Sequence, residues 1–237
     1  MFSRSTRIWS PPPPEAMQQL TFTEEIVLLA LDDKTGAQLP LPVTALGYGL
    51  AGAVLADLAM AGKIDTDAQQ LTVLDPSPTG DPLLDPWLAL ITAETNPRSV
   101  AYWLSVLADR RQEIEQPALD RLIARGILKR QDKKILWVIG LRRYPTIDGH
   151  ERTEVRTRLG QLILGEDLPD PRDATLLSLL RGCRLTDNIF DGPEFSERDE
   201  RLATLAKMDL VGREVAVATT EAIAALSAAM IASVPHM

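Results

Sequence analysis

Three aspartates in a proline-rich stretch have the residue type and spacing that could support chemistry. Asp75, Asp81 and Asp85 lie among Pro, Thr and Gly residues, where carboxylates could bind a metal or act as an acid and base pair. The same residue types also cap helices and hold turns by accepting hydrogen bonds from backbone N–H groups. We favour this structural interpretation and keep an enzyme that uses these carboxylates as an alternative.

The other reactive residue types are few. The chain has one cysteine, Cys183, and two histidines, His150 and His236. Cys183 lies in an apolar helical pattern, which indicates a small core residue rather than a nucleophile. Glycines 47, 49 and 52 have the GxGxxG spacing of a dinucleotide site, but no strand precedes them, so helix packing is the better interpretation. We therefore predict no catalytic residue, no metal and no cofactor.

An apolar run in the first quarter of the chain must form the centre of the fold. Residues 46–62 are almost all Gly, Ala, Leu and Val, and their one charge is Asp57. A helix that is apolar on all sides is either buried or crosses a membrane. The run is shorter than the about 20 apolar residues of a membrane span. It therefore predicts a buried central helix that ends at Gly62.

The remaining segments predict a mainly α fold. Thr21 and Glu24 have the spacing of a capping box, so a helix should begin there. Two short apolar runs, 127–130 and 135–139, flank polar residues and predict a β-hairpin. Other helices are predicted near 86–92 and over 99–111, 117–125, 153–164, 173–185, 196–208 and 216–234, with a short strand at 70–74.

Together these elements predict a compact multi-helix domain around a buried central apolar helix, with a projecting β-hairpin. Residues 18–234 should form this single domain. Residues 1–17 should form a flexible tail, because they are polar and contain the four consecutive prolines 11–14.

Charge is distributed unevenly along the chain. The net charge is −8, which disfavours a general nucleic-acid binder. Residues 110–158 nevertheless hold thirteen Arg or Lys and seven Asp or Glu, so the remainder carries −14. Basic residues beside apolar ones are typical of a peripheral membrane contact. In the alternative interpretation, the apolar residues pack inward and the charges form a solvated face.

We assign two groups of residues to this contact. The lipid-headgroup residues are Arg110, Arg111, Arg142 and Arg143, and the membrane-contact residues of the hairpin are Lys133, Lys134, Leu136 and Trp137. The partner would be an anionic membrane lipid. We also expect that the hairpin could mediate self-association, and that Arg4, Arg7 and Trp9 of the tail could contact a protein partner.

A DNA-binding module is a second alternative. Residues 117–126 followed by a basic hairpin have the form of a helix and wing, although Asp120 and the acidic surroundings disfavour DNA. No secretory signal is visible at the start of the sequence, which predicts a cytoplasmic protein. The excess of arginine over lysine, with abundant alanine, favours a bacterial source.

Four blocks of sequence have the order and spacing of a known family. They are residues 20–31 (LTFTEEIVLLAL), 49–59 (GLAGAVLADLA), 78–85 (PTGDPLLD) and 122–128 (LIARGIL). Over about residues 18–232 the chain resembles the Golgi phosphoprotein 3 family. The resemblance implies a mainly helical domain, with a buried central helix and a projecting hairpin, that binds membranes through phosphatidylinositol 4-phosphate. It also implies a non-enzymatic adaptor on the cytosolic membrane face, which in eukaryotic members is that of the Golgi.

The residues of the family's headgroup pocket are replaced in this chain. That pocket uses a Trp before the central helix, an Arg within it and two further Arg residues three positions apart. The matching positions fall near Pro42 and on Ala51, Gln112 and Glu115. A carboxylate at Glu115 would repel a phosphate, which pairs with cations. We therefore expect the fold to carry over without the specific lipid site, so that nearby arginines would form a different anion site.

Overall fold

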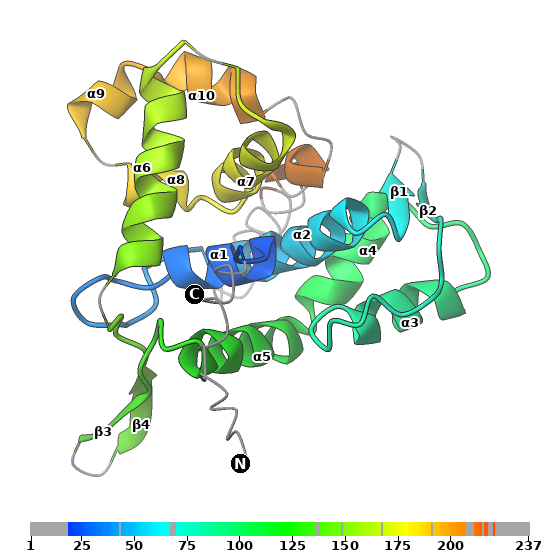
Figure 1. The fold of residues 1–237 in the computed structure, drawn as a ribbon, viewed down its shortest axis with the longest axis horizontal. Helices are drawn as coiled ribbons and strands as arrows, with labels where there is room; N and C mark the ends of the chain where they lie inside the picture. Colours follow the sequence, from blue (N-terminus) through cyan, green and yellow to red (C-terminus); the bar gives the residue numbers. More distant parts are fainter. Residues whose placement is uncertain are drawn as a thin grey trace, which may run out of the picture.

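The computed structural model describes residues 19–220, except 43, 67–69, 136–137, 148, 167, 191, 207–210, 215 and 218–219. For 132–135, 138–142, 196 and 206 it describes the backbone alone. The helices are α1 (Phe22–Leu29), α2 (Ala45–Met60), α3 (Asp85–Ala93), α4 (Val100–Ala108), α5 (Arg111–Ala124), α6 (His150–Leu164), α7 (Pro171–Gly182), α8 (Thr186–Ile189), α9 (Pro193–Ser196) and α10 (Asp199–Ala206). Two antiparallel pairs, β1 (Ile64–Thr66) with β2 (Leu71–Val73) and β3 (Gln131–Ile135) with β4 (Val138–Arg143), complete a mainly α fold (Figure 1).

Helix α2 is the buried centre that the sequence predicts. It packs against α1, α4, α5 and α7, and its residues are buried on every side except near its ends. Gly62 takes the left-handed conformation, with φ +67°, just beyond the helix, as predicted for its terminating residue. Gly49 packs directly on Cys183, because a Cβ at Gly49 would lie 2.8 Å from the Cys183 Cβ. Within the described part of the chain, no helix combines the length and apolarity needed to cross a membrane.

The one charge of α2 binds the start of α1. The Asp57 carboxylate accepts hydrogen bonds from the Phe22 and Thr23 N–H groups at 2.8 and 3.1 Å, and from the Thr23 hydroxyl at 2.8 Å. The predicted capping box is also present: Glu24 N–H donates to the Thr21 hydroxyl, and Thr21 N–H donates to the Glu24 carboxylate. Asp57 therefore satisfies donors that the beginning of α1 would otherwise leave unpaired.

Helix α5 begins earlier than the sequence predicts. The expected start at Pro117 is wrong, because the helix begins at Arg111 and Pro117 lies inside it. Proline removes one hydrogen bond from a helix interior. The helix nonetheless continues through this position, since Ile114 and Leu119 on either side of it are buried against the body of the protein.

The hairpin has different strands from those predicted. Residues 131–134 were expected to form its turn, but 131–135 form β3, with Gln131 opposite Arg143. Ile127 and Leu128, expected in the first strand, are buried in the core at the base of the hairpin. The paired strands start only after the chain leaves the core, and the hairpin projects from the body (Figure 1).

Several other predicted segments lie partly or wholly outside the described residues. The predicted helix over 196–208 corresponds to α10, which begins at Asp199, while Ser196 is the last residue of the short α9. The predicted tail at 1–17 and nearly all of the predicted closing helix at 216–234 lie outside the described residues, as do Leu136 and Trp137.

Candidate functional site

The structure divides the thirteen basic residues of 110–158 into two groups. Seven form ion pairs within the described residues: Arg111, Arg121, Arg125, Arg130, Arg152, Arg156 and Arg158. Five of these pair with acids from other parts of the sequence, such as Glu24, Glu25 and Asp33. The local excess of positive charge is therefore largely balanced inside the fold rather than displayed as one basic face.

The four predicted headgroup arginines have different surroundings. Arg111 pairs with Glu115, with Nε 2.9 Å from Oε2, and donates to the Gln38 side chain at 2.7 Å. Arg110 is exposed at the start of α5, and Arg143 is half-buried at the end of β4. For Arg142 the structure describes the backbone alone. Convergence of the four guanidinium groups on one site stays a prediction.

The hairpin and its base hold five of the other six basic residues, and the sixth is Arg110. Lys133 and Lys134 lie in β3, and Lys129 is exposed where the chain enters the hairpin. Ile147, just after the hairpin, is 61% exposed. Sequence reasoning missed Ile147, although an apolar residue set among Pro, Thr, Asp and Gly was an available signal. Charge and exposed apolar surface therefore do occur together at the base of the hairpin.

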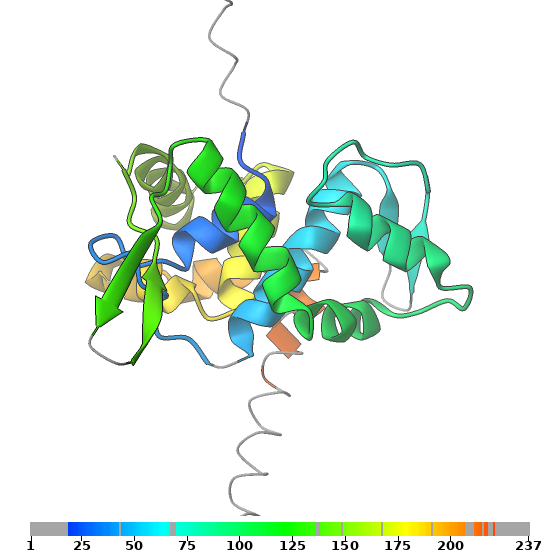
Figure 2. The same cartoon turned by 90° about the horizontal axis from the view of Figure 1, so that it is seen from below.

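A groove of about 490 Å³ lies between α5 and the chain that leaves β4. Figure 2 shows α5 and the hairpin on the same side of the molecule. Gln112 and Glu115, two positions where the resemblance implies arginines, line this groove with Glu113, Gln116, Leu119 and Tyr144. Ala51, a third matching position, is fully buried in α2. Since the lining contains two carboxylates, the groove disfavours a phosphate.

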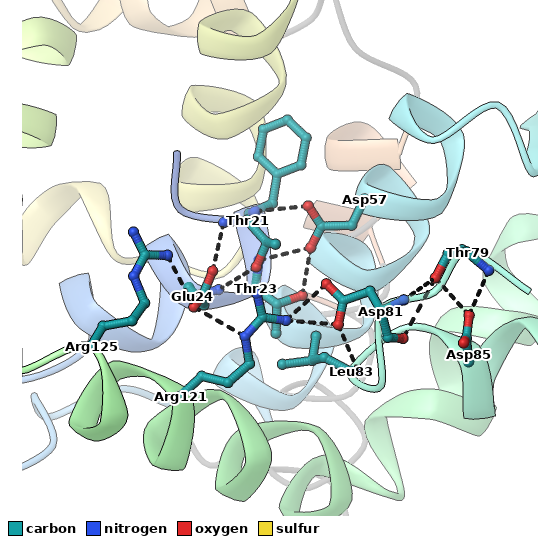
Figure 3. Close-up of polar contacts among 11 residues, drawn as sticks. Thr21, Thr23, Glu24, Asp57, Thr79, Asp81, Leu83, Asp85, Arg121 and Arg125 are labelled. Atoms are coloured by element: carbon teal, nitrogen blue, oxygen red, sulfur yellow. Dashed lines mark hydrogen bonds and ion pairs between the residues drawn. The ribbon is translucent and has the colours of Figure 1, made fainter. Parts of the chain in front are cut away.

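A buried polar network holds α5 in place (Figure 3). Glu24 of α1 is fully buried and forms ion pairs with Arg121 Nε at 3.4 Å and Arg125 Nη1 at 3.5 Å. Arg121 Nη1 also donates to both carboxylate oxygens of Asp81, at 2.7 and 2.8 Å. Because β3 begins seven residues after α5 ends, these contacts fix the point at which the hairpin leaves the body.

The three aspartates considered as candidate catalytic or metal-binding residues accept hydrogen bonds from backbone N–H groups. Asp75 accepts a hydrogen bond from Ser77 N–H at 2.9 Å, Asp81 from Leu83 N–H at 2.8 Å, and Asp85 from Thr79 N–H at 2.7 Å. Side-chain hydrogen bonds, from Lys63 and Thr79 respectively, hold the pKa of Asp75 and of Asp85 below the usual range. These bonds agree with the structural interpretation. Among the described residues, no cluster of His, Cys, Asp or Glu could hold a metal ion.

Two carboxylates of the core have raised pKa values. Burial raises the pKa of Glu25 to about 7 and that of Asp57 to about 6. Glu25 is held between Arg158 and Arg172, which donate to its two oxygens at 3.0 and 2.6 Å. Strongly perturbed pKa values occur both at active sites and in structural ion-pair networks. The partners of Glu25, on α6 and α7, show that it joins three helices.

Comparison with known proteins places this geometry in context. The family model described as Golgi phosphoprotein 3 (GPP34) matches residues 22–224. Vacuolar protein sorting-associated protein 74 of Eremothecium gossypii is 25% identical over 215 residues, which cover 76% of this chain and 64% of that protein. The protein of the same name from Schizosaccharomyces pombe is 25% identical over 167 residues, covering 61% and 48%. The chain thus spans less than two thirds of the length of these relatives.

Proposed function

Because the chain belongs to the Golgi phosphoprotein 3 family, we propose that it is a non-enzymatic peripheral protein that binds anionic membrane surfaces through the β3–β4 hairpin. The family is named for the Golgi, and the relatives are named for vacuolar protein sorting. Both names suit a protein that works at a membrane surface. In this proposal the hairpin contacts the cytosolic face of the membrane.

The observation that carries the proposal is the local charge of the hairpin and its base, residues 129–143. This stretch contains one acid, Asp132, and six basic residues: Lys129, Arg130, Lys133, Lys134, Arg142 and Arg143. Each Lys or Arg near an anionic surface contributes about 1 kcal/mol. Several such residues on one projecting element support reversible attachment, and the exposed side chain of Ile147 adds apolar contact.

We further propose that binding follows surface charge rather than the type of headgroup. A selective phosphate site needs cations arranged around the phosphate. The groove beside α5 instead presents Glu113 and Glu115, and the guanidinium of Arg111 is already shared between Glu115 and Gln38. Vesicles that carry phosphatidylinositol 4-phosphate should therefore bind no better than phosphatidylglycerol vesicles of equal charge.

Vesicle flotation of the full chain tests the proposal. The chain should float with phosphatidylglycerol vesicles and stay behind with neutral phosphatidylcholine vesicles. The variant Lys129→Gln/Lys133→Gln/Lys134→Gln should bind about 100-fold more weakly, since three contacts of about 1 kcal/mol are lost. Equal recovery on neutral and anionic vesicles would refute binding through the charge of an anionic surface, and no recovery on either would refute membrane binding.

A matched control separates the hairpin from net charge. Lys34, Arg198 and Arg213 are exposed and lie outside the hairpin. Changing all three to glutamine removes the same charge and should leave flotation close to that of the unchanged chain. Equal weakening in the two triple variants would contradict binding through the hairpin.

The structure gives less support to the two alternatives. Helix α5, which would be the recognition helix of a DNA-binding module, commits Arg121 and Arg125 to Glu24. An enzyme that uses Asp75, Asp81 or Asp85 would have to release them from the hydrogen bonds that hold their loop. A protein partner for the tail and self-association through the hairpin stay predictions.

A further inference from the structure

A second groove, of about 840 Å³, lies on another side of α5. One wall is the loop of residues 79–83 before α3, and the other is the C-terminal half of α5. Exposed Pro82, Pro117 and Ala124 contribute apolar surface, while Asp120 and Arg121 contribute charge. None of these residues takes part in the membrane role proposed above.

This groove is rigidly formed before anything binds to it. Thr79 donates to Asp85 from its N–H and its hydroxyl, at 2.7 and 2.6 Å. Asp81 is fixed by Leu83 N–H and by Arg121, so the loop is tied to α5 (Figure 3). A ligand that enters a preformed groove does not have to order it, which reduces the free-energy cost of binding.

We propose that the N-terminal arm of this chain, residues 1–18, docks in this groove, with Trp9 and Pro11–Pro14 on its apolar walls. The described chain begins near the same end of α5, because Gln19 and Leu20 line a neighbouring pocket with Arg125. Thr21 N–H donates to one oxygen of the Glu24 carboxylate at 2.9 Å, and the other oxygen is paired with Arg121 in the groove wall. One carboxylate therefore links Thr21 to Arg121 of the groove wall.

The arm has the right length to reach the groove. Residues 15–19 separate the proline run from Leu20 and can span up to about 17 Å when extended. Four prolines in a polyproline II helix cover about 12 Å. The groove side of α5, from Pro117 to Ala124, rises by about 10 Å. The proline run thus matches the length of the wall on which it would lie.

The chemistry of the arm also suits the groove. Prolines have no N–H to satisfy, so the run needs only donors for its carbonyl oxygens. Arg121 uses Nε and Nη1 within the described residues, and its side chain is one-third exposed at the groove. Asp120 accepts from Arg130 and Gln116 through Oδ1, and 55% of its side chain is exposed, so its Oδ2 can accept a hydrogen bond from the Trp9 indole or from Arg7.

Tethering makes weak contacts sufficient. A short linker gives an effective concentration of the order of millimolar, so an arm with even millimolar intrinsic affinity would occupy the groove about half of the time. The proline run is already stiff and therefore loses little conformational entropy on docking. Docking of the arm would cover the groove against other extended peptides.

The test uses the full chain with a spin label on the arm. The sequence has one cysteine, Cys183, which is fully buried, and burial raises the pKa of its thiol to about 12. In the variant Ser10→Cys, the introduced thiol is therefore the reactive one. A nitroxide at this position should broaden the backbone amide signals of Gly80, Asp120 and Ala124, and leave those of Gly160 and Leu164 on α6 sharp. Sharp signals at the groove, or equal broadening at both places, would overturn the proposal.

A matched pair of variants and a mixing experiment complete the test. Ala124→Glu places a charge in the groove and should abolish the broadening, whereas Ala101→Glu, at an equally exposed helical position on α4, should leave it unchanged. Urea unfolding of both variants verifies that they fold. Spin-labelled chain without ¹⁵N, mixed with unlabelled ¹⁵N chain, should cause no broadening. Broadening in that mixture would place the arm on a second copy and overturn docking within one chain.

Discussion

Replacing Glu25 with glutamine should remove a large part of the pH dependence of stability near neutral pH. Glu25 is 1% exposed in the first turn of α1 and accepts hydrogen bonds from Arg158 and Arg172. Desolvation by burial outweighs the attraction of these two arginines and raises the pKa of Glu25 from 4.5 to about 7. Between pH 4.5 and about pH 7, Glu25 therefore keeps a proton in the folded chain that it has lost in the unfolded chain.

The sign and size of the effect follow from this difference. Since the pKa is higher in the folded chain, the stabilisation is fully present below the unfolded value of 4.5 and is lost as the pH rises to about 7. The difference corresponds to a loss of about 3 kcal/mol in the free energy of unfolding. Asp57 acts in the same direction, because burial raises its pKa to about 6, but Glu25→Gln leaves that contribution in place.

Urea unfolding from about pH 5 to about pH 8 measures the effect. As the pH rises, the free energy of unfolding should fall further for the unchanged chain than for Glu25→Gln. The difference between the two losses should approach about 3 kcal/mol near pH 8. The variant should still fold, because Arg158 retains Asp173 and Arg172 retains the Leu20 carbonyl. Glu197→Gln, at an exposed position, is the control and should follow the unchanged chain. Parallel curves for the unchanged chain and Glu25→Gln would refute the reasoning.

Three further predictions concern the buried contacts. Arg121→Ala removes one of the two ion pairs that the buried Glu24 forms within the described residues and should lower the free energy of unfolding by about 2 kcal/mol in urea at neutral pH; an unchanged midpoint would contradict this. Gly49→Ala places a Cβ 2.8 Å from the Cβ of Cys183 and should cost about 1–3 kcal/mol, of which Cys183→Ala should restore a part; strictly additive changes in the double variant would argue against the contact. The buried Cys183 thiol should react with a disulfide reagent only as fast as the chain unfolds, and rapid reaction of the folded chain would show the opposite.

Local signals in the sequence predict the centre of the fold because its determinants are local. Thr21 and Glu24 form their capping box within one helical turn, and Gly62 ends α2 immediately after the apolar run. The start of α5 has no such local signal, because the N-cap residue Arg110 makes no side-chain capping hydrogen bond. Its first turns are mostly charged or polar, and the burial of Ile114 and Leu119 against the body of the protein keeps Pro117 in a helix interior.

The charges of the candidate site were harder to predict, because pairing is a property of three-dimensional proximity. Arg125 meets Glu24 across 101 positions of sequence, and Arg158 meets Glu25 across 133. A count of charges over 110–158 includes these residues as if they were available to a ligand. The hairpin also lacked a clear signal, because strands that project into solvent have no alternation of apolar and polar residues to specify their register.

The four sequence blocks that carry the family resemblance meet in one place in the structure. Glu24 comes from the first block, Asp57 from the second, Asp81 from the third and Arg125 from the fourth (Figure 3). Their contacts fix α1, α2 and the loop before α3 relative to α5. The four blocks therefore contain residues of the network that positions α5 and the hairpin after it.

The groove of about 490 Å³ is chemically separate from this framework. Arg111 and Glu115 pair with each other, and Arg111 contacts Gln38, so within the described residues these interactions do not include the network around Glu24. Substitutions can thus change the charge of the side chains in the groove while the network keeps α5 and the hairpin in place. The network accordingly sets the position of the hairpin, whereas the ligand chemistry of the groove depends on Gln112, Glu113 and Glu115. A chain with carboxylates there should bind membranes by charge on its hairpin and discriminate poorly between phosphorylated headgroups.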